Sequence, residues 1–408
     1  MDPMKVREDF PFYQAHGDDL IYLDSACQSL RPHQVIQAMD DYYREYPACA
    51  GRSVHRLATD VTLGVDSSRE RISEFLNAFG GEIVFTKNAT ESLNLVARGF
   101  PFEKGEVVLT TDLEHNSNHL PWMRCERERG IRREFIPTEE GMVDLESFKE
   151  RMSDRVRMVS LVHTSNVTGT TVPAREIAEI AHDHGALVML DGSQAAPHIP
   201  VDLKELDVDL YALSMHKMLG PSGMGILYGK NEVLEQLEPL LLGGGGVSLS
   251  GYEELEMLPP PDRFEAGLMN YSGILGSGAA VRYLQGLGME EVNRHCLLLN
   301  RVVTEKMKDM PSVEIVGPED PGLRGGILSF NVKGARSNDV AMLLDEMGGI
   351  QVRSGMHCAH PYFRSRDIPG SVRASFYVYN TREECGRFLE TLEQVVRVCP
   401  RDQADRGA

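Results

Sequence analysis

The chain has 408 residues, of which 42% are hydrophobic and 25% charged, and its formal net charge is −19 at pH 7. This composition is typical of a globular protein long enough for two domains, and the negative charge argues against a nucleic-acid or anionic-membrane partner because phosphates would be repelled. No apolar run approaches the length of a membrane-spanning helix, and Met1 to Phe10 lacks the apolar stretch of a signal peptide.

Between about residues 80 and 230, short β-branched runs alternate with helical patterns. This alternation predicts an α/β fold in which crossover helices join the strands of a mainly parallel sheet. The expected strands are Glu82–Thr86, Val107–Thr110, Arg157–His163, Ala186–Leu190, Leu210–Leu213 and Gly225–Tyr228. The glycine- and proline-rich stretch 243–261 is predicted to be a mobile loop.

The pattern changes after about residue 285. Strand-like and helix-like segments follow in chain order: Met289–Met310, Val313–Val316, Gly326–Val332, Asn338–Met347, Ile350–Arg353, Ser371–Tyr377 and Thr381–Val398. We therefore predict a large α/β domain over residues 20–285 and a smaller α+β domain over residues 286–400. Residues 1–19 are expected to pack near the small domain, and the polar residues 401–408 to form a flexible tail.

Polar residues repeatedly follow the ends of the predicted strands. They are Asn88 with Thr90, Glu114 with His115, Asn166, Asp191 and Lys217. In open α/β sheets, ligands bind outside the carboxyl ends of the strands. We therefore expect these residues to share one site.

Asp191 and Lys217 are the most informative pair. Asp191 follows one apolar strand, and Lys217 follows the next strand, 26 residues later. Taken singly, Asp191 is as well explained as a capping carboxylate, and Lys217 as a solvated lysine. Together, with Ser214 and His216 as phosphate contacts, they match the acid and the Schiff-base lysine that an enzyme using pyridoxal phosphate needs. Burial near cationic groups is expected to lower the pKa of Lys217, which makes it a competent nucleophile and base.

The segment Asn88-Ala89-Thr90-Glu91 follows a strand and opens a helix. Its simplest interpretation is a helix start, with Asn88 as the cap and Glu91 returning the hydrogen bond. The functional interpretation adds a phosphate at the same helix end, where free N–H groups favour an anion and Thr90 adds a hydroxyl. His115 likewise has two interpretations: a polar loop residue, or a ring that stacks on the cofactor and exchanges protons.

The seven cysteines are scattered and never occur in Cys-x-x-Cys spacing. This pattern predicts a reducing, cytoplasmic location and argues against a disulfide framework. Cys358 differs from the others because Arg353, His357 and His360 lie near it in a turn-rich segment, and such neighbours favour the nucleophilic thiolate. The alternatives are a buried structural cysteine and a metal site. No metal is predicted, because the ligand spacing is too tight for a usual tetrahedral site.

Further motifs extend over nearly the whole chain: Val6–Pro11, Tyr22–Ala26, Ala89–Glu91, Glu114–His115, Ser165–Val167, Asp191–Gln194, Ser214–Lys217, Gly220–Gly223, Phe264–Gly267, Arg353–Ala359, Val372–Ser375 and Tyr379–Thr381. At these residues the chain resembles the class V aminotransferase-related enzymes of fold type I. Within them it is most similar to the group II (SUF-type) cysteine desulfurases and selenocysteine lyases. The resemblance implies a seven-stranded, mainly parallel sheet and a homodimer, with Phe264–Ser272 near the neighbouring subunit.

The resemblance also implies a role for each candidate residue toward pyridoxal 5'-phosphate. Lys217 matches the Schiff-base lysine, Asp191 the partner of the pyridinium nitrogen, and His115 the histidine that stacks on the ring. Three residues match the family's phosphate ligands: Thr90, Ser214 and His216. Gln194 and Asn166 match its contacts to the phenolic oxygen of the cofactor and its surroundings.

On the substrate side, Arg373 matches the arginine that pairs with the substrate carboxylate, which suits a bidentate guanidinium. Arg353 and Asn166 are further substrate candidates, and Cys358 matches the sulfur-accepting nucleophile. The implied reaction converts L-cysteine to L-alanine and leaves a persulfide on Cys358. The sulfur then passes to an acceptor protein, such as a scaffold for iron–sulfur clusters.

Two departures from the family pattern keep alternatives open. Leu268-Met269 stand where threonine-proline is common, and Met356 replaces a polar residue. They keep a second hypothesis open, another class V enzyme: a transaminase, an epimerase, a β-lyase or a selenocysteine lyase. A non-enzymatic scaffold in sulfur delivery is the third hypothesis, against which the intact lysine, aspartate, histidine and arginine argue.

Overall fold

The large sheet follows the predicted α/β pattern. The structure is a computed structural model that describes residues 1–17 and 19–399, so the predicted tail 401–408 lies outside it. Within the described residues the sheet has seven strands, in the order β2-β10-β9-β8-β7-β3-β4. They are β2 (Ile83–Thr86), β3 (Val107–Thr111), β4 (Arg132–Ile136), β7 (Val156–Val162), β8 (Leu187–Asp191), β9 (Leu210–Ser214) and β10 (Gly225–Gly229). Only β10 runs antiparallel to its neighbours, which confirms the predicted mainly parallel sheet.

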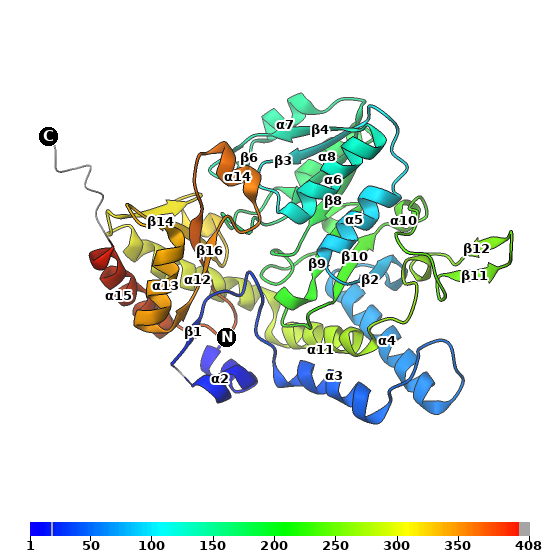
Figure 1. Cartoon of the computed structure of the whole chain (residues 1–408), viewed down its shortest axis with the longest axis horizontal. Coiled ribbons are helices and arrows are strands. Elements are labelled where there is room, and N and C mark those ends of the chain that lie inside the picture. The colour runs from blue at the N-terminus through cyan, green and yellow to red at the C-terminus, as the bar shows by residue number, and fades with distance from the viewer. Residues whose placement is uncertain (18, 400–408) are drawn as a thin grey trace.

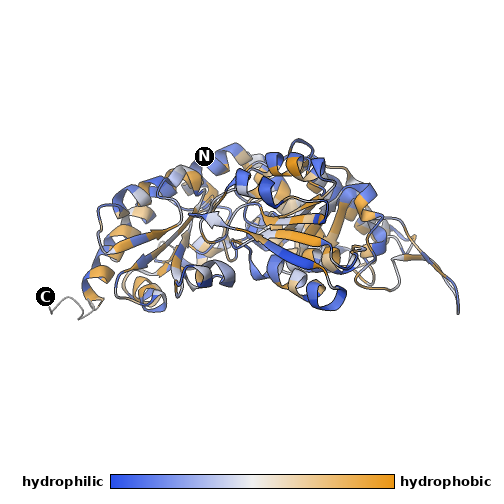
Figure 2. Cartoon of the chain, turned by 90° about the horizontal axis from the view of Figure 1, so that it is seen from above, coloured by the Kyte–Doolittle hydropathy of each residue, from blue (hydrophilic) through white to orange (hydrophobic). Residues whose placement is uncertain are grey.

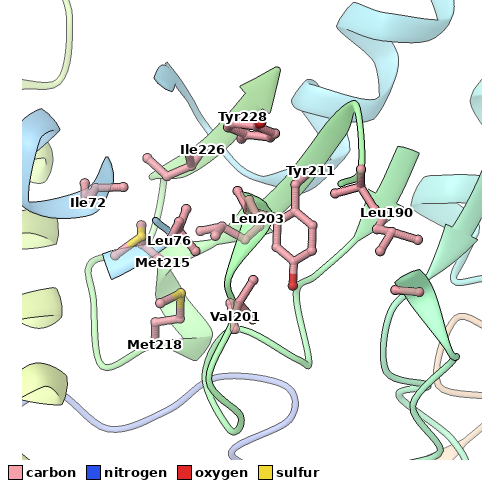
Figure 3. Close-up of a cluster of buried hydrophobic side chains, with 14 of the residues drawn as sticks. Ile72, Leu76, Leu190, Val201, Leu203, Tyr211, Met215, Met218, Ile226 and Tyr228 are labelled. Atoms are coloured by element: carbon pink, nitrogen blue, oxygen red, sulfur yellow. The ribbon is translucent and has the colours of Figure 1, made fainter. Parts of the chain in front are cut away.

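Successive side chains of the central strands enter two different apolar cores, because the side chains of a strand alternate between faces. In β9, Tyr211 and Leu213 pack with α4 (Arg56–Phe75), α8 (Ala174–Asp183) and α11 (Tyr271–Leu287). Figure 3 shows Tyr211, Ile226 and Tyr228 on this face, near Ile72 and Leu76 from the end of α4.

The other face of the same sheet is covered by α5 (Ala89–Gly99) and α6 (Asn116–Arg129), which pack on Leu210, Ala212 and Leu227. A sheet buried on both faces explains why most predicted strands were continuous apolar runs.

The remaining elements of this part of the chain are shorter or peripheral. They are α3 (His33–Glu45), β5 (Thr138–Glu139), β6 (Met142–Val143), α7 (Leu145–Arg151), α9 (Leu203–Leu206), α10 (Asn231–Leu234), β11 (Val247–Ser250) and β12 (Leu255–Met257). The last two correct a prediction: the stretch 243–261 contains an antiparallel hairpin, which projects beyond the helices in Figure 1.

The C-terminal part forms a second sheet, in the order β13-β14-β17-β16, with every neighbouring pair antiparallel. Its elements are α12 (Met289–Met307), β13 (Val313–Val316), β14 (Ile327–Val332), α13 (Ser337–Gly348), β15 (Ile350–Gln351), β16 (Arg353–Gly355), α14 (His360–Ser365), β17 (Ser371–Ser375) and α15 (Arg382–Val398). Helices α12, α13 and α15 cover one face with an apolar core of their own. The domain boundaries remain a prediction. The separate apolar core of the C-terminal part supports this prediction.

The N-terminal segment contacts the C-terminal part directly. It contains α1 (Pro3–Arg7), α2 (Pro11–His16) and β1 (Ile21–Tyr22), and β1 pairs in parallel with β15. The Arg7 Nε donates to the Tyr379 carbonyl at 2.8 Å, and the same guanidinium forms a buried ion pair with Glu384. Seen from above in Figure 2, apolar strands lie inside and the outward helix faces are hydrophilic. Among the helices of residues 1–17 and 19–399, none combines the length and apolar character needed to span a membrane.

Candidate active site

A cavity of about 260 Å³ lies where the large sheet meets the C-terminal part of the chain. All eleven sequence-predicted residues line it: Thr90, His115, Asn166, Asp191, Gln194, Ser214, His216, Lys217, Arg353, Cys358 and Arg373. Several of these residues follow strands of the large sheet. The carboxyl ends of its parallel strands lie at one edge, so these residues come together there. Of the polar residues expected at the strand ends, Glu114 is the exception: it does not line the cavity, and its buried carboxylate binds Thr111 and Asn118.

The predicted Schiff-base pair occupies the centre of this cavity. Asp191 ends β8, and its Oδ1 accepts the Ser193 N–H at 3.0 Å. Lys217 is the last residue of a one-turn 3-10 helix, Met215–Lys217, directly after β9. Burial, and then the positive charges of Arg373 and Arg353, lower the pKa of the Lys217 amine to about 8, while Asp191 opposes the shift. The amine thus becomes neutral, and nucleophilic, close to physiological pH.

This lowered pKa gives a testable pH dependence. A lysine whose pKa is about 8 is neutral above that pH and cationic below it. We expect the rate at which the apoprotein captures pyridoxal phosphate covalently to rise about fifty-fold from pH 6 to pH 8, in proportion to the neutral amine. The captured cofactor is fixed by borohydride and counted by mass spectrometry. A parallel series with a simple alkyl amine corrects for ionisation of the cofactor itself. A rate that climbs unchanged to pH 10 contradicts the lowered pKa.

The amino end of α5 lines one end of the cavity. Asn88 caps the helix by accepting the Glu91 N–H at 3.0 Å, as predicted. The return bond differs from the prediction, because the Glu91 carboxylate accepts the N–H of Lys87 and not that of Asn88. Ser214 Oγ accepts the Ala89 N–H at 2.9 Å. A helix end with this hydroxyl beside it suits an anion.

Close packing behind this helix end predicts a mutational effect. A Cβ atom on Gly225 would lie 2.4 Å from the Cα of Asn88 and 2.5 Å from its carbonyl carbon. Replacement of Gly225 by alanine must therefore displace the cap of α5. We expect affinity for pyridoxal phosphate to fall at least about tenfold, which corresponds to about 1.4 kcal/mol. Equilibrium dialysis measures this loss, with Gly386→Ala as the control because open space surrounds Gly386. Unchanged affinity in a folded Gly225→Ala protein contradicts the expectation.

His115 caps α6 and faces the cavity. Its Nδ1 accepts the Ser117 N–H at 3.1 Å, so in the neutral ring the proton lies on Nε2. Burial, followed by the charge of Lys217, lowers the pKa of His115 to about 4. A neutral imidazole is suited to stack on an aromatic ring, and this geometry agrees with the role that the family resemblance implies.

The substrate end is built around Arg373 in β17, whose side chain is almost fully buried. Its Nη1 donates to the Asn166 carbonyl at 3.1 Å, and its Nη2 pairs with Asp24 Oδ1 at 3.2 Å. The Asn166 side chain donates to the His357 carbonyl at 2.7 Å, and that of Gln194 to the Ala26 carbonyl at 2.7 Å. These bonds join residues that follow strands of the large sheet to β17, to the loop of Cys358 and to the turn at Ala26.

Several buried polar atoms around this cavity lack a partner among the described residues. They are Asn166 Oδ1, Gln194 Oε1 and Arg373 Nε. Because buried polar atoms in proteins are nearly always hydrogen-bonded, such atoms indicate a polar ligand. Hydroxyl and carboxylate groups supply the matching donors and acceptors. The residues present therefore fit pyridoxal phosphate together with an amino-acid substrate.

Cys358 lies on the short loop between β16 and α14, half-buried at the cavity edge. Both His357 and Cys358 adopt left-handed backbone angles, with φ of 47° and 59°. Non-glycine residues hold this conformation only where neighbours enforce it. Here the Asn116 N–H binds the Cys358 carbonyl at 2.6 Å. Arg353 Nη2 donates to Cys358 Sγ at 3.7 Å. Within the described chain, no three His, Cys, Asp or Glu side chains gather as a metal site.

The sequence-based prediction missed some residues of the cavity wall, notably Ser117, Ser193, His357 and Cys27. The sequence distinguished Cys358 from the other cysteines and gave Cys27 no role. In the structure, the Cys27 sulfur is half-buried in the cavity and accepts a hydrogen bond from Arg353 Nη1 at 3.0 Å. The available signal was its place directly after the motif Tyr22–Ala26.

Comparisons with known proteins agree with this architecture. The model of the family "Aminotransferase class-V" matches residues 21–388. A probable cysteine desulfurase from Halalkalibacterium halodurans is 37% identical over 401 residues, covering 97% of this chain and 98% of the relative. A cysteine desulfurase from Haloferax volcanii is 36% identical over 413 residues, covering 96% of each. Among solved structures, the apo cysteine desulfurase from Thermococcus onnurineus superposes with a TM-score of 0.93 at 38% identity, covering 97% of this chain and 98% of that one.

This chain belongs to the class V aminotransferase family, whose cofactor is pyridoxal 5'-phosphate. Within that family it falls in the branch of the cysteine desulfurases. The predicted family, fold type and cofactor are thereby confirmed. The roles of individual residues stay predictions.

Proposed function

We propose that this protein is a cysteine desulfurase that converts L-cysteine to L-alanine and carries the sulfur as a persulfide on Cys358. The observation that carries the proposal is a single cavity that joins Lys217, Asp191 and Arg373 to a half-buried thiol. A transaminase needs the first three groups but has no use for a cysteine at the cavity edge. The relatives at 36–40% identity bear the same activity in their names.

Pyridoxal phosphate, when bound, supplies an electron sink for the substrate α-carbon. Lys217 would hold the cofactor covalently, and its neutral amine would take the α-proton of the substrate. Asp191 would pair with the ring nitrogen, and His115 would stack on the ring. Arg373 pairs with the substrate carboxylate and thereby fixes which bond of the substrate faces Lys217.

Cys358 then receives the sulfur. Its thiolate attacks the substrate sulfur, so the Cβ–S bond breaks and an S–S bond forms on Cys358 Sγ. The electron pair of the broken bond stays with the carbon, which is protonated to the methyl group of alanine. Overall, cysteine and the enzyme thiol become alanine and an enzyme persulfide, and no external oxidant or reductant is needed. A second thiol, on an acceptor protein such as an iron–sulfur scaffold, takes the outer sulfur.

The protein acts, we propose, as a cytoplasmic homodimer. Exposed apolar side chains gather in residues 43–63 and 241–268, and such clusters are typical of subunit interfaces. The strongly exposed members are Tyr43, Val54, Leu63, Leu241, Leu242, Tyr252, Leu255 and Leu268. Leu268 belongs to the segment Phe264–Ser272, which is expected to reach the neighbouring subunit. Analytical ultracentrifugation tests this assembly.

A product analysis tests the activity. The holoenzyme is incubated with L-cysteine and a reducing thiol, and alanine, sulfide and keto acid are quantified. Desulfuration predicts alanine and sulfide in equal amounts with no keto acid. Pyruvate with ammonia would indicate a β-lyase, and a keto acid without sulfide a transaminase. L-selenocysteine in place of L-cysteine shows whether selenium is also removed.

A further inference from the structure

Two cysteine sulfurs share one guanidinium at the cavity edge. Arg353 Nη1 donates to Cys27 Sγ at 3.0 Å, and Arg353 Nη2 donates to Cys358 Sγ at 3.7 Å. The two N–H groups belong to one rigid, planar guanidinium, so both sulfurs lie at the same end of the Arg353 side chain. Cys27 and Cys358 are 331 positions apart in the chain, and the fold alone brings them together. Arg353 begins β16, and Cys358 lies between β16 and α14, which Figure 1 labels.

Cys27 is held in place from several directions. The Cys27 N–H binds the Asp24 carbonyl at 3.0 Å, which closes a tight turn. The preceding N–H, of Ala26, donates to Ser375 Oγ at 2.9 Å, and the Ala26 carbonyl accepts from Gln194 at 2.7 Å. Ser375 of β17 and Gln194, which follows β8, thus hold the turn that carries Cys27. The Cys27 sulfur is therefore held in the cavity and is not a loosely exposed thiol.

We propose that Cys27 is a second sulfur carrier, which takes the outer sulfur of a persulfide on Cys358 and so frees Cys358 for another turnover. This inference rests on the proposed function. The substrate sulfur reaches Cys358 from within the cavity, so the outer sulfur of the persulfide extends toward the cavity, where Cys27 lies.

The groups around the two sulfurs suit this transfer. The Cys27 thiol donates to the carboxylate of Asp24, which is placed to remove its proton. The Cys27 sulfur attacks the outer sulfur, the S–S bond to Cys358 breaks, and the electron pair leaves on Cys358 Sγ. Arg353 donates to that leaving sulfur, which stabilises its negative charge. The proton held by Asp24 returns to a sulfur, so one persulfide and one thiol exchange roles without net oxidation.

Attack on the inner sulfur is the competing reaction, which would give a Cys27–Cys358 disulfide and hydrosulfide. Arg353 favours the first course, because it contacts the sulfur that departs as the Cys358 thiolate. The two courses give different products and are therefore separable by experiment.

The test counts alanine formed per chain when neither reductant nor acceptor is present. Each alanine then leaves one sulfur on the protein. The holoenzyme is expected to form two alanines per chain in the rapid phase, and Cys27→Ser only one. Cys49→Ser, which alters a half-buried cysteine outside the cavity, is the matched control and should still give two. Absorbance of the bound cofactor and the unfolding midpoint verify that each variant is folded and loaded.

Mass spectrometry after persulfide-specific alkylation locates the sulfur. In the unmodified enzyme, one extra sulfur should appear first on the peptide of Cys358 and then on that of Cys27; this time course suffices if Cys27→Ser fails to fold. One alanine per chain with the extra sulfur on Cys358 alone overturns the inference and leaves the proposed function intact. A Cys27–Cys358 disulfide also overturns it, as does sulfur on Cys27 in Cys358→Ser. No alanine from the unmodified enzyme overturns the proposed function as well.

Discussion

Replacement of Lys217 by alanine is expected to reduce desulfuration at least about a thousandfold, since one side chain supplies both the covalent hold on the cofactor and the base. Lys217 is the lysine that lines the cavity with Asp191, and its lowered pKa leaves the amine nucleophilic near neutral pH. The variant should still bind pyridoxal phosphate, because the end of α5 and the Asp191 carboxylate remain. Borohydride should no longer fix the cofactor to the chain.

The measurements are alanine formation under saturating cofactor and the mass of the borohydride-treated chain. Lys149→Ala serves as the control, because Lys149 is exposed on α7 and pairs only with Glu146 in the same helix. Cofactor fixed to the Lys217→Ala chain at another lysine would show that the wrong residue was chosen, and activity within tenfold of the unmodified enzyme would exclude Lys217 as the base.

Replacement of Cys358 by serine should remove at least about two orders of magnitude of activity toward L-cysteine, while cofactor binding stays unchanged. Serine fits the same space and keeps the loop, but its hydroxyl cannot carry a persulfide. Activity toward L-selenocysteine should fall much less, since selenium leaves carbon more readily than sulfur. The ratio of the two activities, measured as alanine formed, therefore rises steeply in the variant.

This ratio separates a chemical role of Cys358 from a structural one. A cysteine that merely supports its loop would lower both activities together, with a changed cofactor spectrum or unfolding midpoint. Cys125→Ser, which alters a cysteine buried in the core beneath α6, provides that comparison. Full turnover of L-cysteine by Cys358→Ser would remove the persulfide from the mechanism.

The sequence predicted those parts of the fold that depend on local pattern. Six strands of the large sheet were assigned within one or two residues, because each is a short apolar run that ends at a polar residue. The seventh strand, β4, was not assigned from its residues. It lies at the sheet edge, and its segment Arg132-Arg133-Glu134 is charged and partly exposed, so it lacks the apolar pattern of a buried strand. The hairpin of β11 and β12 was missed for the same reason, since most of its residues are exposed.

The candidate site divides in a similar way. Asp191 and Lys217 were predictable because each follows a strand, and strand ends of one sheet meet. Cys358 was recognised as a candidate nucleophile by its cationic neighbours, but placing it and Arg373 at that sheet required the family resemblance, because nothing local links them to it. The sequence signal for Cys27 was its place directly after the motif Tyr22–Ala26, which marked the segment but gave the thiol no role. Its meaning depends on a side-chain contact with Arg353, and such a contact between distant segments exists only in the folded chain.

The pairing of β16 with β17 sets Arg353 directly opposite Arg373, and both line the cavity beside Lys217. Two guanidinium groups thus converge beside the Lys217 amine, inside a molecule whose formal net charge is −19. Opposite charges focused by low-dielectric walls raise the local concentration of small anions. Chloride, sulfate and hydrosulfide are accordingly expected to compete with the amino acid, and catalysis should weaken with rising ionic strength even though the outer surface repels these ions.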